Sequence, residues 1–326
     1  MTARWAILGA GAISRDFANG LTHATLGHLH AVGARSAADA RAFADAHGAA
    51  VAGTYDEILA RDDVDAVYIG TVHTTHGELA IAALEAGKAV LCEKPLTTTP
   101  ADTDAVLAVA ARTGLPLVEA FKYRFGPFPD LLRRAVADGA IGDVVEVLST
   151  IGFTATARTG RLFDPAVAGG AILDAGCYPV SLAVGAAAWA GQPVDGARVI
   201  EADGIVGETG VDETASAVLR LGAVTARVRT AIVEDLPRAA RIVGTAGEIE
   251  IPNVWGSRQQ STDAAVLRRP DGSVEHLTAA TLNPMAAEAD AVIAALRDGR
   301  TEAPEMPWVQ TRVIARLLED WRRALD

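Results

Sequence analysis

A glycine-rich turn near the start of the chain is the first candidate for chemistry, because its backbone could hold a phosphate group. The segment Gly9-Ala10-Gly11-Ala12-Ile13-Ser14 follows a short apolar run, Trp5–Leu8. Glycine at position 9 permits a tight turn, and glycine at position 11 lets the backbone approach an anion held by the amides of the next helix. The glycine pair alone is a weak signal, and the third small residue is Ser14 rather than glycine. Its place between a strand and a helix favours a dinucleotide cofactor bound at Gly9, Gly11, Ala12 and Ile13.

The end of the second predicted strand bears on which dinucleotide binds. This strand ends in Gly33-Ala34-Arg35-Ser36, without an acidic residue at its tip. A carboxylate there would bind the 2′-hydroxyl of the ribose and repel a 2′-phosphate, whereas a guanidinium and a hydroxyl suit a phosphate monoester. The alternatives are that Arg35 is a solvated surface residue and that Asp39, one turn further on, belongs to a helix face. We therefore predict NADP rather than NAD, held in part by Arg35 and Ser36.

A lysine and two histidines follow later strands of the series. The segment Thr71-Val72-His73-Thr74-Thr75-His76 comes after one strand, and Cys92-Glu93-Lys94-Pro95 closes the next. Ligands of parallel α/β sheets bind at the carboxyl ends of the strands, so Lys94 is expected to reach the binding crevice. Alternatively, Lys94 could cap the strand or form an ion pair with Glu93. The spacing of His73 and His76 does not indicate a metal site, because no third ligand is apparent, and we expect no metal.

The first third of the sequence alternates short apolar runs with helical patterns. The runs are typical of buried parallel strands and lie at Trp5–Leu8, His30–Ala34, Ala66–Ile69, Ala89–Cys92 and Leu115–Val118. Helical patterns lie between them at Ile13–Thr22, Ala37–His47, Tyr55–Ala60, Gly77–Ala86 and Ala101–Thr113. Repetition of strand and helix with short connections predicts right-handed βαβ units. Residues 1–121 are therefore predicted to form a dinucleotide-binding Rossmann domain, an α/β fold with a doubly wound parallel sheet.

The pattern changes after about residue 121. A helical segment at Pro129–Asp138 is followed by strand-like runs at Val144–Phe153, Ala215–Leu221, Ala223–Val233, Ala239–Gly244 and Glu248–Ile251. Alternating apolar and polar residues in the third and fourth of these runs are typical of an antiparallel sheet with one wetter face. Amphipathic helices are predicted at Asn283–Arg297 and Trp308–Leu325. We predict that residues 122–326 form an α+β domain with a large, mostly antiparallel sheet, whose last helix, at about 308–325, could pack back on the first domain.

Composition excludes several classes of protein. The 326 residues are 50% hydrophobic and 21% charged, with a net charge of −12. This acidic balance argues against a nucleic-acid partner and against a polybasic membrane patch. The best candidate for a membrane span, Val180–Ala190, is shorter than the roughly 18 to 20 residues required. The N-terminal residues lack the features of a signal peptide, and two cysteines, Cys92 and Cys177, cannot form a disulfide framework or a four-thiolate zinc site, so we expect a cytoplasmic protein.

Several blocks follow one another in order along nearly the whole chain. They are Gly9-x-Gly11-x-Ile13-Ser14, Gly87-Lys88 through Cys92-Glu93-Lys94-Pro95, Glu119-Ala120-Phe121-Lys122-Tyr123-Arg124, and Gly169-Gly170-Ala171-Ile172-Leu173-Asp174-Ala175-Gly176-Cys177-Tyr178-Pro179. Together these blocks resemble the glucose–fructose oxidoreductase / inositol dehydrogenase / rhizopine catabolism (Gfo/Idh/MocA) family. The resemblance implies an NAD(P)-dependent oxidoreductase acting on sugars, cyclitols or related alcohols. It places Lys94 beside the nicotinamide, and Asp174 and Tyr178 at the family's aspartate and proton-handling positions. Many inositol-dehydrogenase-like members have histidine at the position of Tyr178. The tyrosine makes this chain more similar to the dihydrodiol dehydrogenase and glucose–fructose oxidoreductase branch of the family.

The spacing of Asp174 and Tyr178 suits the chemistry that the resemblance implies. In a helix over Leu173–Trp189 the two side chains would lie on one face, near the helix start that Pro179 requires. The helix dipole there favours a carboxylate and a developing phenolate. We predict Tyr178 as proton donor or acceptor, Lys94 as its electrostatic and hydrogen-bonding partner, and Asp174 as the orienting residue. The ammonium is expected to lower the pKa of Tyr178, and desolvation and nearby cations the pKa of Lys94. Without the resemblance, Tyr178 would be interpreted as a core residue.

The resemblance also bears on residues around this site. Thr71 and Glu93 are expected to bind the cofactor, and His73 and His76 to line its nicotinamide side, although either histidine could instead satisfy backbone groups of its loop. The remaining candidates face the substrate: Arg124, Phe153 and Arg161. For Arg124 the alternative is a salt bridge at the seam between the domains.

Together these features predict an NADP-dependent oxidoreductase that transfers hydride between nicotinamide and a sugar, cyclitol or vicinal diol. Two alternatives stay open. One is a sugar oxidoreductase or glycosidase that keeps its cofactor tightly bound, and the other is a non-catalytic ligand sensor on the same fold. The resemblance further implies a homodimer or homotetramer, which could pair through an apolar outer sheet face at Val224, Ala226 and Val228.

Overall fold

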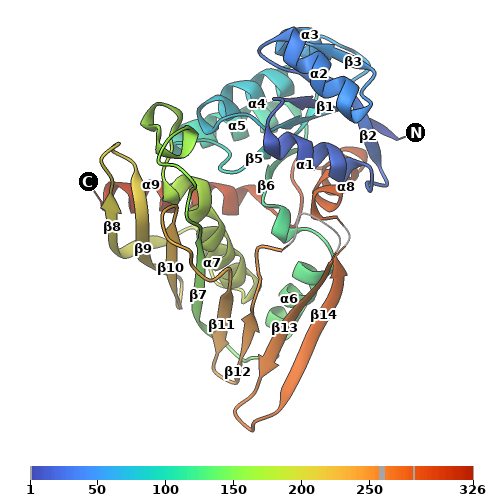
Figure 1. The fold of residues 1–326 in the computed structure, drawn as a ribbon. Coiled ribbons are helices and arrows are strands. Elements are labelled where there is room, and N and C mark those ends of the chain that lie inside the picture. Colours follow the sequence, from blue (N-terminus) through green and yellow to red (C-terminus); the bar gives the residue numbers. More distant parts are fainter. Residues whose placement is uncertain (1, 257–260, 282, 326) are drawn as a thin grey trace.

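A parallel sheet of six strands forms the N-terminal part of the computed structural model, which describes residues 2–256, 261–281 and 283–325 (Figure 1). Its strands lie in the order β3-β2-β1-β4-β5-β6. They are β1 (Ala3–Leu8), β2 (Gly27–Gly33), β3 (Val51–Gly53), β4 (Ala66–Ile69), β5 (Ala89–Glu93) and β6 (Leu117–Ala120). The direction of strand order reverses between β1 and β4, where doubly wound sheets bind their ligands. The predicted Rossmann architecture is confirmed, with β3 added as a short edge strand.

Helices connect these strands close to the predicted positions. They are α1 (Ala12–Leu21), α2 (Ala37–His47), α3 (Tyr55–Leu59), α4 (His76–Glu85) and α5 (Pro100–Thr113), and the short 3-10 turns η1 (His73–Thr75) and η2 (Lys122–Arg124) follow β4 and β6. Threonine side chains begin two of the helices: Thr54 accepts a hydrogen bond from the Glu57 amide and Thr99 from the Asp102 amide. These caps satisfy amides that a helix start leaves unpaired.

Eight strands form the second sheet, in the order β14-β13-β12-β11-β7-β10-β9-β8. They are β7 (Val144–Gly152), β8 (Arg198–Val206), β9 (Asp212–Leu221), β10 (Val224–Ala231), β11 (Ala240–Gly244), β12 (Gly247–Ile251), β13 (Ser261–Arg268) and β14 (Val274–Thr281). The described strands pair antiparallel except for β7 and β10, which run parallel. The predicted mostly antiparallel sheet is confirmed, and β8, β13 and β14 are additions to it.

The remaining helices join the two sheets. They are α6 (Pro127–Ala137), α7 (Cys177–Trp189), α8 (Pro284–Arg297) and α9 (Trp308–Arg323). Helices α6 and α7 pack on the large sheet, α8 packs against α1 and β5 of the parallel sheet, and α9 packs against both α5 and α7. The Trp308 indole donates to the Leu117 carbonyl of β6 at 2.9 Å. The C-terminal part of the chain thus contacts both sheets (Figure 1).

The large sheet does not present the apolar outer face that the sequence indicated. Val224, Ala226 and Val228 are fully buried in the core that includes α7 residues. Their strand alternates these residues with Thr225, Arg227 and others that are more exposed. The interpretation of those three residues as an outward face is therefore wrong, because the apolar side of the alternation points toward the helices.

A long apolar helical stretch runs through this core. By length and composition, Pro165–Trp189 could cross a membrane, with a mean hydropathy of 1.4 in its most apolar window. The sequence-based expectation that no run is long enough is wrong for this stretch. However, 83% of that window is buried inside the protein, as in a core helix whose apolar surface packs against its own fold.

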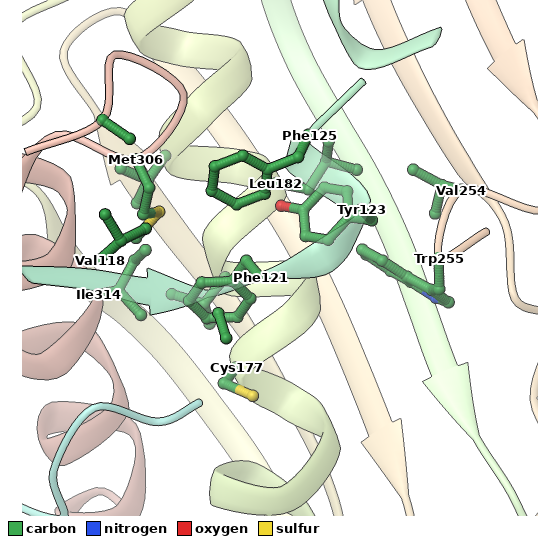
Figure 2. Packing of buried hydrophobic residues seen from close by; sticks show 14 of the residues in the cluster. Val118, Phe121, Tyr123, Phe125, Cys177, Leu182, Val254, Trp255, Met306 and Ile314 are labelled. Atoms are coloured by element: carbon green, nitrogen blue, oxygen red, sulfur yellow. The ribbon is translucent and has the colours of Figure 1, made fainter. Parts of the chain in front are cut away.

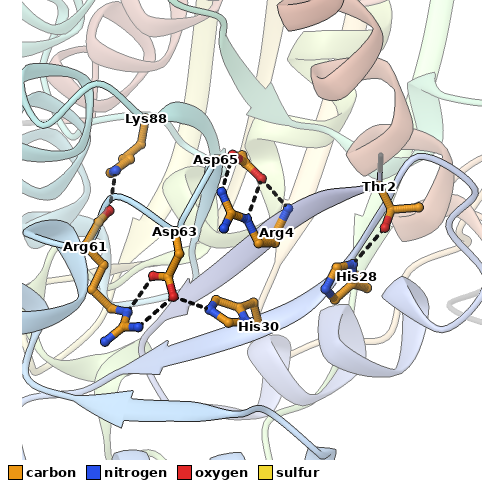
Figure 3. Close-up of polar contacts among 8 residues, drawn as sticks. All are labelled: Thr2, Arg4, His28, His30, Arg61, Asp63, Asp65 and Lys88. Carbon is orange, nitrogen blue, oxygen red and sulfur yellow. Dashed lines mark hydrogen bonds and ion pairs between the residues drawn. The ribbon is translucent and has the colours of Figure 1, made fainter.

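Polar contacts tie together the amino ends of β1, β4 and β5 (Figure 3). Arg4 donates to both carboxylate oxygens of Asp65, and the Lys88 ammonium donates to the Arg61 carbonyl. Asp63 receives hydrogen bonds from Arg61, and it lies 3.0 Å from the His30 ring, which together lower the pKa of that carboxyl. These contacts lie at the end of the sheet opposite the carboxyl ends of the strands.

Candidate active site

A large cavity lies along the carboxyl ends of the parallel strands and continues toward the second sheet. Its volume is about 1230 Å³. Its walls include the turn after β1, the end of β2, the loop after β4 and the end of β5, with α7 and β7 on the other side. This is the position at which doubly wound sheets bind ligands, and the volume exceeds the range of about 300–1,000 Å³ usual for small-molecule sites.

The glycine turn fits a dinucleotide pyrophosphate. Gly9 has a φ of +103°, and a Cβ there would lie only 2.9 Å from the Gly70 carbonyl oxygen. Gly11 begins α1 without a side-chain cap, so the first amides of the helix are left for a bound anion. Ser14, at the third small position, is buried, and its hydroxyl donates to the Gly70 carbonyl at 3.4 Å. Gly9, Gly11, Ala12 and Ile13 all line the cavity.

The two residues predicted to bind a 2′-phosphate differ in position. Arg35 lines the cavity, whereas Ser36 is not among its lining residues and caps α2 by accepting a hydrogen bond from the Asp39 amide. Asp39 itself lines the cavity, which the sequence assigned to a helix face. Arg15 and His47, which the sequence did not single out, line the same wall.

Lys94 lies directly after β5, where the part of the cavity along the strand ends meets the part beside α7 and β7. Its ammonium donates to the Asp174 backbone carbonyl at 2.6 Å and lies 5.0 Å from the centroid of the Tyr178 ring. Glu93 beside it accepts from the Tyr68 hydroxyl at 2.7 Å and from the Lys94 amide at 3.3 Å. The Lys94–Pro95 peptide bond is cis. Residues eighty positions apart in sequence are thereby brought together.

Tyr178 is held in a group of aromatic rings, part of which Figure 2 shows. Phe121, Tyr123 and Trp255 have ring centroids between 5.5 and 5.9 Å from that of Tyr178. The Trp255 indole donates to the Thr150 carbonyl, and the Lys122 ammonium donates to the Trp255 carbonyl at 2.6 Å. This packing fixes the plane of the Tyr178 ring, while the residue still lines the cavity and is only half-buried.

The helix that carries Asp174 and Tyr178 begins with a widened turn. A π-helical segment, Ile172–Gly176, runs directly into α7, so Pro179 lies inside a continuous helix rather than at its start. In a π register the partner of the Asp174 carbonyl would be the amide of residue 179, and proline has none. That carbonyl instead accepts from Lys94. At the start of the segment, the Ile172 amide donates to the Asp212 carboxylate at 2.6 Å.

The Asp174 carboxylate faces Arg161 from the loop before the helix. The Arg161 guanidinium donates to Asp174 Oδ1 at 2.6 Å, and the two side chains are 55% and 10% exposed. Burial raises the pKa of Asp174, but the positive charges of Lys94 and Arg161 outweigh it and hold the pKa below its usual value. Asp174 is therefore ionised near neutral pH.

The pKa values of the central pair differ from the expected direction. Burial raises the pKa of Tyr178, and the Lys94 charge opposes this rise without overcoming it. For Lys94, burial alone lowers the pKa, but the Cys177 thiol, Tyr178, Asp174 and Glu93 raise it well above its usual value. The prediction that both values fall is wrong, because desolvation of the phenol and the acidic partners of the ammonium dominate. Near neutral pH the pair is therefore an ammonium beside a neutral phenol.

His73 and His76 both line the cavity and are buried. A ring nitrogen of His73 lies 3.1 Å from the Ala168 carbonyl, and one of His76 lies 2.8 Å from the Pro95 carbonyl. Burial, with the nearby Lys94 charge, lowers the pKa of His73 to about 3, and burial lowers that of His76. Both rings are neutral near pH 7. Both histidines therefore bind backbone carbonyls, as the alternative interpretation expected, and they also line the cavity.

The residues predicted to face the substrate divide into two groups. Phe153 and Arg161 line the cavity, as Thr71 and Glu93 do on the cofactor side. Arg124 is buried outside the cavity lining. Its guanidinium donates to the Ser181 hydroxyl at 2.9 Å and to the Gln310 side chain at 2.5 Å. The assignment of Arg124 to the substrate is not supported, because its donors join α7 to α9.

Several cavity residues were not predicted, chiefly Lys122, Trp255 and Arg238. Lys122 directly follows the carboxyl end of β6, so the strand-end rule that singled out Lys94 could have found it. Trp255 and Arg238 come from loops beside β11 and β12, and their approach depends on how the second sheet packs. Within the described ranges, no group of three or more metal-ligating side chains is found.

Known proteins resemble this chain over almost its whole length. Residues 3–121 match the oxidoreductase family with an NAD-binding Rossmann fold, and residues 130–250 match the GFO/IDH/MocA C-terminal domain. The trans-1,2-dihydrobenzene-1,2-diol dehydrogenase of Xenopus tropicalis is 32% identical over 330 residues, which cover 98% of this chain and 97% of the relative. That of Homo sapiens is 33% identical over 334 residues, covering 100% and 97%.

Solved structures share the fold. A 3-ketoreductase from Actinomadura kijaniata, in complex with NADP and TDP-benzene, is 24% identical with a TM-score of 0.88, covering 100% of this chain and 98% of its own. An aldose-aldose oxidoreductase from Caulobacter crescentus, complexed with glycerol, is also 24% identical, with a TM-score of 0.86 and coverage of 99% and 97%. The family matches, with relatives that span the full length, show that this protein is an oxidoreductase of the GFO/IDH/MocA family.

Proposed function

We propose that the protein is an NADP(H)-dependent oxidoreductase that acts on a vicinal diol or a sugar, with Lys94 and Tyr178 at the reacting carbon. The observation that carries the proposal is the meeting of the Lys94 ammonium, the Tyr178 ring and the Asp174 carbonyl in the large cavity. The relatives named as dihydrodiol dehydrogenases support the substrate class. The preference for NADP rests on Arg35 in the cavity wall, with Arg15 on the same wall.

The bound nicotinamide supplies or accepts the hydride, and the protein handles one proton at the substrate oxygen. In the reduction direction, the carbonyl oxygen gains negative charge as the hydride reaches carbon. Tyr178 Oη gives its proton to this oxygen and becomes a phenolate. The Lys94 ammonium stabilises the developing negative charge by its field, since it stays protonated near neutral pH.

In the oxidation direction the base is the Tyr178 phenolate, which is scarce near neutral pH because the pKa of the phenol is raised, so the rate should increase with pH. The Lys94 charge opposes the rise in the Tyr178 pKa and therefore assists in both directions. Asp174 orients this pair through its backbone carbonyl, and its carboxylate holds Arg161 at the substrate end of the cavity.

The substrate end of the cavity has largely apolar walls. Ile151, Phe153 and Trp255 line it together with Tyr178. Such walls suit the apolar face of a ring, and the hydroxyls of a diol would face Tyr178 and Arg161. The broader sequence-based expectation of a homodimer or homotetramer in the cytoplasm remains a proposal, which light scattering of the purified protein and cell fractionation test.

The proposed function is tested by NADPH absorbance. The purified protein is offered NADP+ or NAD+ with trans-1,2-dihydrobenzene-1,2-diol, aldoses and inositols, and NADPH or NADH with the matching carbonyl compounds. We expect turnover with a diol or an aldose and a lower KM for the phosphorylated cofactor. A lower KM for NADH contradicts the cofactor assignment, and no turnover with any member of the panel contradicts the substrate class. Product formation without release of reduced cofactor would instead favour an enzyme that retains its cofactor.

A further inference from the structure

A buried carboxyl group lies behind the catalytic lysine and takes no part in the proposed proton transfer. Glu119, in β6, is only 3% exposed. Its Oε1 accepts a hydrogen bond from the Leu96 amide at 2.9 Å. Leu96 follows Lys94 by two residues, so this bond fixes the backbone of the turn that carries the lysine. Within the described part of the chain, Glu119 supplies the side-chain acceptor of the Leu96 amide.

The surroundings of Glu119 come from four elements. The charged groups that face it are the Arg124 guanidinium of η2 and the Lys94 ammonium at the end of β5, and the Thr311 hydroxyl of α9 lies near it. The titratable thiols of Cys92 and Cys177 also lie within its electrostatic reach. Its second oxygen, Oε2, is buried without a close hydrogen-bond partner among the described residues. A buried polar atom without a hydrogen bond lowers the stability of the fold, so its presence calls for an explanation such as a functional role.

We propose that Glu119 is a positioning residue for Lys94, which holds the turn at Lys94–Leu96 so that the ammonium stays over the Tyr178 ring. The inference rests on the proposed function of Lys94 and adds a residue that touches neither cofactor nor substrate. Strand β6 is hydrogen-bonded to β5 along its length, so the carboxyl group and the turn share one rigid support. Loss of the bond frees the Leu96 amide and lets the lysine leave its position.

The charge state of Glu119 adds a second effect. Burial raises the pKa of Glu119 to about 7, against the opposing influence of the Leu96 amide, the Thr311 hydroxyl and the positive charges of Arg124 and Lys94. The group is therefore neutral below that pH and negative above it. Both forms accept the Leu96 hydrogen bond, but the negative form partly offsets the field of the Lys94 ammonium.

The first test separates position from charge. Alanine at 119 removes the acceptor, whereas glutamine keeps an oxygen that can accept from the Leu96 amide. We expect Glu119→Ala to lower kcat on the order of tenfold or more with KM for NADPH unchanged, as for loss of a hydrogen bond to a charged group. Glu119→Gln should restore most of kcat at pH 6. Glu288→Gln is the matched control, because Glu288 is a buried carboxyl of α8 without a hydrogen-bond partner among the described residues.

The second test uses the pH profile of kcat/KM. A merely structural role of Glu119 would leave this profile unchanged. The ratio of wild-type to Glu119→Gln kcat/KM for reduction should fall as pH rises, with a midpoint near 7. Thr311→Val should shift that midpoint upward, since the hydroxyl lowers the pKa of Glu119. Equal pH profiles for the wild type and Glu119→Gln overturn the charge effect.

The outcomes are distinguishable from failure of the proposed function. If Lys94→Ala keeps the wild-type kcat, the role of Lys94 itself is wrong. If Lys94→Ala loses activity while Glu119→Ala keeps it, only the positioning role of Glu119 is overturned. If Glu119→Ala does not fold, the Glu119→Gln variant decides: a kcat as low as that of Lys94→Ala, despite an unchanged melting temperature, also contradicts the proposal.

Discussion

Lys94 and Tyr178 meet through the face of the aromatic ring, with the lysine ammonium 5.0 Å from the ring centroid. The ammonium is held there by the Asp174 carbonyl, 2.6 Å away. Because proline follows Tyr178 inside a widened helical turn, that carbonyl is available to a partner outside the helix. The relationship joins the end of β5 in the parallel sheet to the helical segment at the start of α7, which packs on the second sheet.

Cofactor preference gives a prediction at Arg35. Removing its guanidinium in Arg35→Ala should raise KM for NADPH by about tenfold to a hundredfold and leave KM for NADH nearly unchanged, because only the 2′-phosphate loses a charged donor. Steady-state kinetics with both cofactors measure this. Arg41→Ala is the control, since Arg41 is an exposed arginine of α2 outside the cavity lining. An equal rise in KM for both cofactors would show that Arg35 does not read the phosphate.

The Arg161–Asp174 ion pair predicts a shift in pH dependence. Arg161 lowers the pKa of Asp174, so Arg161→Ala should raise it. The ionised Asp174 carboxylate also acts on Lys94, so activity that depends on this charge is lost as pH falls through the pKa of Asp174, and the acidic limb of kcat/KM should therefore move to higher pH. Arg158→Ala is a matched control in the same loop, where Arg158 pairs with Glu213 at 2.9 Å. An acidic limb that stays in place would contradict the assigned role of the pair.

His73 predicts how stability changes with pH. Burial lowers its pKa to about 3 in the folded protein, whereas an unfolded histidine titrates near 6.5. Between these values the unfolded chain binds the extra proton, so the free energy of unfolding falls as pH decreases below about 6.5. Urea denaturation at pH 7 and pH 5 should show a smaller decrease for His73→Asn than for the wild type, by on the order of 1–2 kcal/mol. His28→Asn, at an exposed position, should behave as the wild type.

Sequence patterns located most of the elements that carry the site. The apolar runs before Gly9 and Glu93 correspond to β1 and β5, and α2 begins and ends where its pattern indicates. These elements are buried on both faces or have clear caps, so local signals are strong. β3 has only three residues, and most residues of β8 are exposed. Neither strand therefore contains a long apolar run by which it could be recognised in the sequence.

Details of the site depended on tertiary packing. The π-helical turn before α7 could not be predicted, because Pro179 equally indicates a helix start. The direction of the Tyr178 and Lys94 pKa shifts also required burial and the positions of Cys177 and Glu93. Arg124 lies in a conspicuous block after β6, yet its donors are taken by α7 and α9. Sequence spacing can place a residue at a strand end. It does not show which neighbouring groups will occupy the hydrogen-bond donors of that residue.

A double-mutant cycle on the Lys94–Tyr178 pair tests the central claim most directly. Single-turnover oxidation of NADPH, at saturating cofactor and with the carbonyl compound identified in the activity screen, is measured for Lys94→Ala, Tyr178→Phe and the double variant. Tyr123→Phe is the control, because the Tyr123 hydroxyl is bonded to Ser181 outside the cavity. We predict that Tyr178→Phe slows hydride transfer by about 10²–10⁴-fold and that the double variant is little slower than the single ones, as for residues that act as a unit. A wild-type rate in Tyr178→Phe, with Tyr123→Phe unchanged, would contradict the account.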